Sequence, residues 1–80
     1  MDKNASSKFT EDDYLLIFAE NVNKCLKQQE IEQRNLSIDT NIPEGNISRI
    51  LRGKTKNPRF ITLDLLSKAI QMDLTDLFKR

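Results

Sequence analysis

The feature that most constrains this chain is a break at residues 41–43, Asn-Ile-Pro, between two short stretches of helical pattern. Proline lacks an amide hydrogen, so it fits the first turn of a new helix and disrupts the interior of an existing one. The break therefore predicts one helix over about 33–40 and a second over about 43–52. Two short helices joined by a tight connection form the centre of the predicted fold.

Both central helices have clear inward positions. Leu36 is the apolar anchor of the first helix. In the second, the helical period turns three apolar residues inward: Ile47, Ile50 and Leu51. Gly53 is expected to end that helix in a left-handed conformation, which glycine adopts without steric cost.

An N-terminal helix is predicted over about 11–28. Phe18, Val22 and Cys25 follow one another at spacings of four and three, so they form one apolar stripe in which Cys25 is a small buried hydrophobe. Thr10 is the expected N-cap, and the acids that follow it lie where the helix dipole favours negative charge. Three further apolar residues belong to the core or, alternatively, form a surface for a protein partner: Tyr14, Leu15 and Ile17.

Two more helices are predicted near the C-terminus. One spans about 62–72, and Asp73 caps a short fifth helix. Their inward residues are Leu63, Leu66, Ala69 and Ile70 in the first, and Leu74, Leu77 and Phe78 in the second. Phe60 and Ile61 are expected to pack back onto the core.

The chain contains no strand pattern, internal repeat or low-complexity segment, so the predicted fold is all-α, a compact five-helix bundle. Its 80 residues are enough for one domain with a modest core. We expect a flexible arm over residues 1–9 and a single domain over residues 10–80. No apolar run is long enough for a membrane span or a signal peptide, so we expect no membrane association and a cytoplasmic location.

The residue inventory argues against an enzyme. The chain has no histidine and one cysteine, so it lacks an imidazole base and the ligands for a thiolate or histidine zinc site. It also lacks the glycine-rich loop of nucleotide-binding proteins. The acids at 11–13 fit the start of a helix better than a catalytic carboxylate cluster. We therefore expect no catalytic activity, no metal and no cofactor.

Positive charge gathers in one segment of a chain whose net charge is only +1. No acid lies between Gly45 and Thr62, a stretch that holds five cations: Arg49, Arg52, Lys54, Lys56 and Arg59. A local patch of this kind binds polyanions even when the total charge is near zero. The alternative is a solvated charged loop without a partner.

Gln33 through Phe78 resembles the lambda-repressor-like (Cro/C1-type, XRE family) helix-turn-helix domain. The resemblance rests on Leu36, on Ile42, on the segment Gly45-Asn46-Ile47-Ser48-Arg49-Ile50 and on Arg52-Gly53-Lys54. Residues 53–60 are especially similar to a loop of lambdoid phage repressors. The resemblance implies a DNA-binding domain in which the helix after the break enters the major groove, which is wide enough for one α-helix.

The resemblance also implies roles for individual residues. The positions that face base edges in the family are here Glu44, Gly45 and Arg49, and Asn46 and Ser48 flank them as further candidates for base contact. The positions implied to contact the DNA backbone are Gln33, Arg52, Lys54, Lys56 and Arg59. Arg49 is the strongest candidate for direct recognition, because arginine can donate two hydrogen bonds to one guanine.

Some of these positions have simpler alternatives. Glu44 can accept from a cytosine amino group, or it can merely stabilise the helix start. Gly45 has no side chain for recognition and costs about 1 kcal/mol of helix propensity relative to alanine, although it permits close approach of the backbone to DNA. Gln33 is either a phosphate contact or an exposed residue at a helix start.

A buried pair also departs from the resemblance. Many phage members bury an arginine of the first helix against a glutamate after the third, and the matching positions here are Leu26 and Leu51. Since both are apolar, no charge is left buried without a partner, and such replacements are often neutral or stabilising. We expect Leu26 and Leu51 to be in contact.

The expected function is a sequence-specific transcriptional regulator, a repressor, that binds a palindromic operator in double-stranded DNA as a homodimer. The resemblance to the family implies a dimer surface on the fifth helix and the loop before the fourth, including Pro58 and Phe60. The alternative is an antitoxin or another protein-interaction module on the same fold, because a fold does not fix a function.

Overall fold

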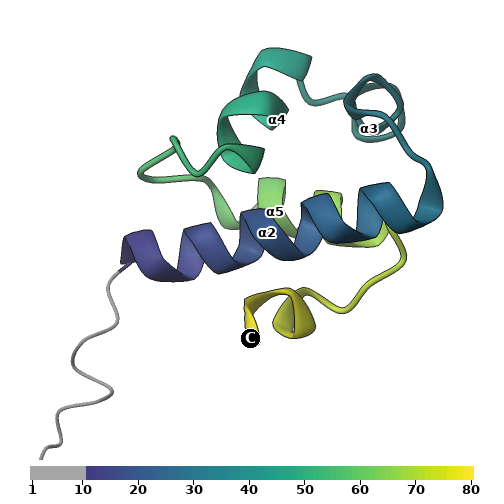
Figure 1. Ribbon diagram of the computed structural model, residues 1–80. Coiled ribbons are helices and arrows are strands. Elements are labelled where there is room, and N and C mark those ends of the chain that lie inside the picture. Colours follow the sequence, from purple (N-terminus) through teal and green to yellow (C-terminus); the bar gives the residue numbers. More distant parts are fainter. Residues whose placement is uncertain (1–10) are drawn as a thin grey trace, which may run out of the picture.

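The computed structural model describes residues 11–80, which form four α-helices and one 3-10 helix without any strand (Figure 1). The elements, in chain order, are α2 (Glu11–Gln29), α3 (Gln33–Thr40), α4 (Glu44–Leu51), α5 (Phe60–Ala69) and η1 (Leu74–Phe78). The all-helical prediction is therefore confirmed. The expected arm over residues 1–9 and the expected cap Thr10 lie outside the described residues.

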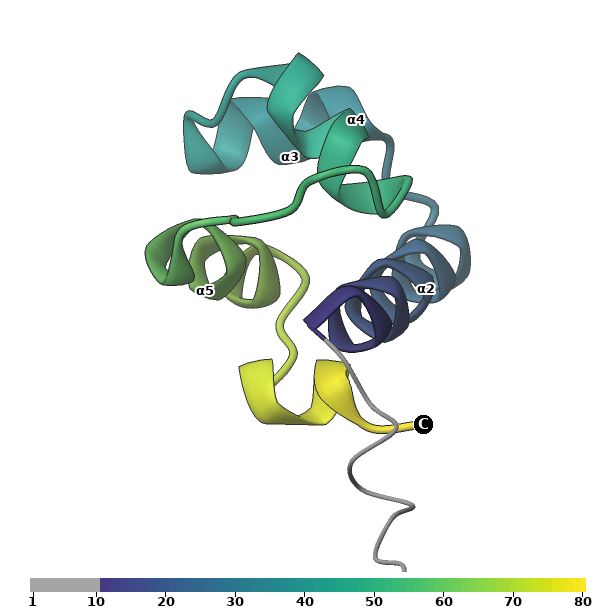
Figure 2. The ribbon, with the colours of Figure 1, turned by 90° about the vertical axis from the view of Figure 1, so that its left-hand side faces the viewer.

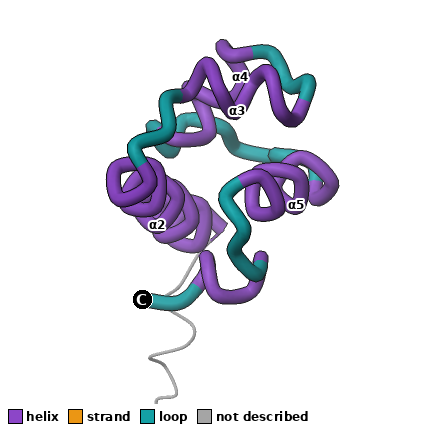
Figure 3. Tube along the Cα trace, turned by 90° about the vertical axis from the view of Figure 1, so that its right-hand side faces the viewer, coloured by secondary structure: helices purple, strands orange, loops and turns teal. Residues whose placement is uncertain are grey.

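The elements pack in a ring around one core. α2 contacts α4 and η1, α3 contacts α4 and α5, and α5 contacts η1 (Figures 2 and 3). The α3–α4 pair forms one end of the molecule, and η1 lies at the opposite end beneath α2 and α5 (Figure 2). The residues that are fully buried come from every element: Phe18, Val22, Leu36, Ile47, Leu66, Ile70 and Leu77. All of these residues belong to a single hydrophobic cluster.

Three amide side chains of α2 tie the ring together. Asn23 Nδ2 donates to the backbone oxygen of Leu51 (2.9 Å), and Gln29 Nε2 donates to that of Ile70 (3.1 Å). Asn21 Nδ2 donates to the backbone oxygens of Leu77 and Lys79, both at 2.8 Å. Each acceptor lies at the C-terminal end of a helix, where carbonyls have no partner within the helix.

Each of the four α-helices is followed, within two residues of its end, by a residue with positive φ. These residues are Glu30 (57°), Asn41 (63°), Gly53 (70°) and Gln71 (60°). After Gly53, for example, the amide of Lys54 donates to the oxygen of Arg49 (2.9 Å), which satisfies a carbonyl of the last turn. The predicted left-handed conformation of Gly53 is confirmed, and asparagine at position 41 tolerates it, whereas the side chains of Glu30 and Gln71 make it costly.

The helix starts use different caps. At α3, the amide of Glu32 donates to Asn35 Oδ1 (3.1 Å) as part of a reciprocal capping box. At α4, Pro43 is the N-cap residue, so the helix begins directly after the predicted break. Asp73 caps η1 as predicted, since its carboxylate accepts from the backbone amide of Thr75.

The start of α5 differs from the prediction. The helix spans Phe60–Ala69 rather than about 62–72, and Phe60 and Ile61 are 70% and 51% exposed. The expectation that both pack onto the core is therefore wrong. Both lie in the first turn, before the first buried residue, Leu63, and the helical period places Ile61 opposite the buried face. The fifth helix is a 3-10 helix rather than an α-helix.

The N-terminal apolar residues mostly join the core. Ile17 is buried and Leu15 packs against the core cluster, whereas Tyr14 is 47% exposed. Leu26 and Leu51 are both buried in the same cluster, although their direct contact stays a prediction. In the described part of the chain, no helix combines the length and the apolar character needed to cross a membrane.

Candidate nucleic-acid interface

The connection between α3 and α4 is held by hydroxyl groups. Ser37 Oγ donates to the backbone oxygen of Ile42 (2.6 Å), and Thr40 Oγ1 accepts from the amide of Ile42 (3.2 Å). Thr40 Oγ1 also donates to the oxygen of Leu36 (2.6 Å). With Ile42 itself buried, these bonds fix the direction in which the chain enters α4.

α4 buries one side and exposes the other. Ile47, Ile50 and Leu51 face the core, whereas most remaining residues of the helix are exposed: Glu44, Gly45, Asn46 and Arg49. Ser48 is half-buried. Because residues four apart share a helix face, Gly45 and Arg49 lie together opposite the buried side. We call the side formed by residues 44–46, 48 and 49 the outward face of α4.

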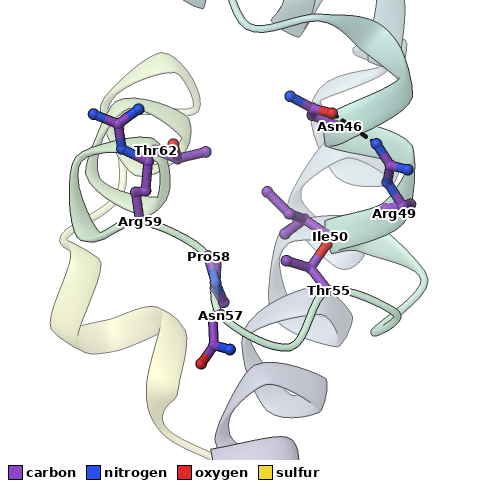
Figure 4. Close-up of a pocket in the computed structure, with 8 residues that line it drawn as sticks. All are labelled: Asn46, Arg49, Ile50, Thr55, Asn57, Pro58, Arg59 and Thr62. Carbon is purple, nitrogen blue, oxygen red and sulfur yellow. Dashed lines mark hydrogen bonds between the residues drawn. The ribbon is translucent and has the colours of Figure 1, made fainter.

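Arg49 is oriented by a neighbour on the same helix. Its Nη2 donates to Asn46 Oδ1 at 2.9 Å, a contact between residues three apart (Figure 4). The bond uses one of the five N–H donors of the guanidinium and holds the side chain along the helix. The amide nitrogen of Asn46 and the other guanidinium donors can still bind a ligand.

A cleft of about 350 Å³ separates α4 from the start of α5 (Figure 4). Asn46, Arg49 and Ile50 line it from α4, and Arg59 and Thr62 line it from the other side. The connecting loop completes the cleft with three residues: Thr55, Asn57 and Pro58. Two guanidinium groups and several uncharged polar side chains thus surround one concave surface, with no acid among the lining residues.

The segment that lines the cleft carries positive charge and, between Gly45 and Thr62, no acid. Arg49, Arg52, Lys54, Lys56 and Arg59 are all exposed. Among the described side chains none of these five cations forms an ion pair, and the ion pairs Asp64–Lys68 and Asp76–Lys79 lie elsewhere. The field of the five cations is therefore available to an external anion.

A comparison of the sequence with models of protein families identifies the family of the chain. Residues 21–80 match the model of the Cro/C1-type HTH DNA-binding domain. The chain belongs to this family. The matched segment contains all of α3, α4, α5 and η1 together with the second half of α2. No curated protein and no solved structure matches the chain significantly.

This Cro/C1-type domain brings together some of the predicted contact residues and separates others. Asn46, Arg49 and Arg59 line the cleft between α4 and α5. Lys56 lines a different groove, of about 260 Å³, together with Tyr14, Leu15, Asn57, Pro58 and Leu63. Arg52 is the C-cap residue of α4, and Lys54 follows Gly53. Gln33 is the first residue of α3 and is half-buried, and Glu44 is the first residue of α4.

Three polar residues of the cleft were not among the predicted contacts: Thr55, Asn57 and Thr62. Each lies within the acid-free segment between Gly45 and Thr62, so the charge pattern marks the region but not these side chains. Their hydroxyl and amide groups can donate hydrogen bonds to phosphate oxygens. Among the described side chains, those of residues 13–80, no group of His, Cys, Asp and Glu is arranged to hold a metal ion.

Proposed function

We propose that this Cro/C1-type domain is a sequence-specific transcriptional repressor that places the outward face of α4 in the major groove of its operator. The observation that carries the proposal is the position of Arg49. It lies on a side of α4 that is free of bulky apolar groups, and it borders a cleft with a second arginine, Arg59, and no acid. A side of this shape and charge fits a groove of DNA.

Direct recognition of bases is assigned to α4. Arg49 can donate two hydrogen bonds to one guanine while Asn46 keeps its side chain extended along the helix. Asn46 and Ser48 flank Arg49 as further polar contacts, and Glu44 can accept from a cytosine amino group. Gly45 presents only backbone atoms to the bases.

Contacts with the DNA backbone are assigned to the surrounding residues. Arg59 lies across the cleft from Arg49, so a sugar-phosphate strand can pass between α4 and α5. Thr55, Asn57 and Thr62 add uncharged donors to that passage. Four further residues supply contacts outside the cleft: Gln33, Arg52, Lys54 and Lys56. Such contacts set the position of the protein on DNA and carry little sequence information.

Dimer formation completes the proposal. One eight-residue helix contacts few base pairs. A two-fold dimer doubles the number of base pairs that are recognised, because it binds two half-sites about 34 Å apart. Phe60 is 70% exposed at the start of α5, next to the loop that contains Pro58. Exposed aromatic side chains are common in protein interfaces. We assign the dimer surface to this loop, the start of α5 and η1.

The exposed apolar residues also favour a second candidate function, an antitoxin or another protein-interaction module. Ile38 on α3 is 71% exposed. A protein partner that binds against α3 would bury this side chain. On this alternative, DNA binding is weak and unspecific, and Ile38→Ser abolishes binding of the partner protein.

Selection from a pool of random duplexes tests the main proposal against this alternative. The protein is incubated with the pool at physiological salt, and bound duplexes are recovered and sequenced. A palindromic motif with half-sites one helical turn apart is the expected result. Recovery of unenriched sequences, with weak binding that salt abolishes, would refute operator binding and favour the protein-interaction module.

A further inference from the structure

The chain has two glycines, and only one of them is explained by the fold. Gly53 has a φ of +70°, and a Cβ atom built on it would lie 3.3 Å from Leu16 Cδ1. Backbone conformation and packing therefore both favour glycine at that position. Gly45 has neither feature, since it lies in α4 without a positive φ, and a Cβ atom there would meet nothing within 4 Å.

Gly45 is also in a position where glycine is unfavourable. It is the second residue of α4, and glycine loses more conformational freedom in a helix than any other residue. Alanine at this site would keep the helix and clash with nothing in the isolated domain. The reason for a glycine is thus not found within the domain itself.

The surroundings of Gly45 indicate where the reason lies. It shares the outward face with Arg49, one helical turn away, and its neighbours Glu44 and Asn46 are exposed. The missing side chain leaves the backbone open on the side that carries the predicted base contacts. A ligand that reaches Arg49 therefore passes close to the Cα atom of Gly45.

We propose that Gly45 is a clearance position, at which the edge of a base pair lies against the backbone of α4 in the space that a Cβ atom would occupy. The inference rests on the proposed function and deepens it, because it makes a residue without a side chain a determinant of specific binding. α4 then lies deeper in the groove than a helix with a side chain at this position can.

The test compares Gly45→Ala with wild type in stability and in binding to the operator obtained from the selection. Alanine raises helix propensity, so the unfolding midpoint is expected to rise by about 2–6 °C. The Kd for the operator is expected to increase about tenfold, because an added methyl group is forced into a packed contact. The dependence of the Kd on salt stays unchanged, since Gly45 neutralises no phosphate.

Gln71→Gly is the matched control. Gln71 has a φ of 60° and follows α5, outside the α3–α4 pair, so glycine there relieves an unfavourable conformation without touching α4. This variant is expected to raise the unfolding midpoint by a similar amount and to leave the operator Kd unchanged. Together, the two variants separate an effect of the added methyl group from an effect of greater stability.

Two results would overturn the clearance role. Gly45→Ala that binds the operator as tightly as wild type would show that nothing approaches the backbone there. Gly45→Ala with a lowered unfolding midpoint would show that the fold itself requires the glycine. Failure of the proposed function is distinguishable from both, because wild type would then yield no operator in the selection.

Discussion

Asn23 on α2 donates a hydrogen bond of 2.9 Å from its Nδ2 to the backbone oxygen of Leu51, the last residue of α4. The bond joins two helices across 28 residues of sequence, and it satisfies a carbonyl that has no partner within its own helix. Because α4 carries the proposed base contacts, Asn23 helps to set the position of that helix on the domain.

Replacing Asn23 tests this connection. Asn23→Ala is expected to lower the free energy of unfolding by about 1 kcal/mol, which is the typical net value of one hydrogen bond. The measurement is urea denaturation, in which the midpoint falls and the slope stays constant. Gln28→Ala, at an exposed amide on the same helix, serves as the control and should leave the midpoint near that of wild type. Equal midpoints for Asn23→Ala and wild type would show that the bond contributes nothing.

At the residues with positive φ that follow the helices, two substitutions are expected to change the stability of the domain in opposite directions. Gly53→Ala is expected to destabilise the domain by about 1–2 kcal/mol, because alanine is strained at positive φ. Its Cβ atom would also lie 3.3 Å from Leu16 Cδ1. Gln71→Gly is expected to stabilise the domain by about 0.5–1 kcal/mol, since it relieves the same strain. Thermal unfolding of both variants checks the signs, and a loss of stability in Gln71→Gly would contradict the assignment.

Asp73 is expected to cause part of the pH dependence of the stability of the domain. Hydrogen bonds from the backbone amide and the hydroxyl of Thr75 lower the pKa of this carboxyl below its ordinary value of 3.8. The charged form therefore stabilises the folded state above pH 3.8, and this contribution is lost as the pH falls through the lowered pKa. Asp73→Asn keeps a residue that caps helices well but removes the titration. The urea midpoint of this variant should fall less than that of wild type as the pH is lowered. Equal falls in the two midpoints would show that Asp73 does not contribute to the pH dependence of stability.

Lys54 is expected to contact phosphate and not bases. Lys54→Ala should weaken binding to all duplexes by a similar factor and reduce the slope of log K against log salt by about one. Titration of the operator and of a scrambled duplex at several salt concentrations gives both quantities. A loss confined to the operator would instead make Lys54 a determinant of sequence preference.

Much of the fold could be predicted from the sequence because apolar spacing determines which helix faces are buried. Leu36, Ile47 and Leu66 are fully buried as their patterns predict. The break at residues 41–43 separates α3 from α4, and Gly53 has the expected left-handed conformation. These features depend on local periodicity and on the backbone preferences of proline and glycine, which a single sequence contains.

Other features depend on contacts between distant residues. The hydrogen bonds of Asn21, Asn23 and Gln29 span 28 to 58 residues, so no local pattern indicates them. The left-handed conformations of Glu30 and Gln71 are not apparent either, because such side chains disfavour them. The cleft beside Arg49 depends on where the fold places the start of α5 relative to α4, whereas the charge of the segment is apparent from the sequence alone.

The most direct test of base recognition by α4 is to repeat the random-duplex selection with Arg49→Ala. This variant is expected to recover the operator motif with the preference for one guanine lost in each half-site. Its affinity for the wild-type operator should fall by about 1–3 kcal/mol. If the variant recovers the unchanged motif, or loses affinity equally for every duplex, Arg49 contacts no base and the assignment of α4 as the recognition helix is contradicted.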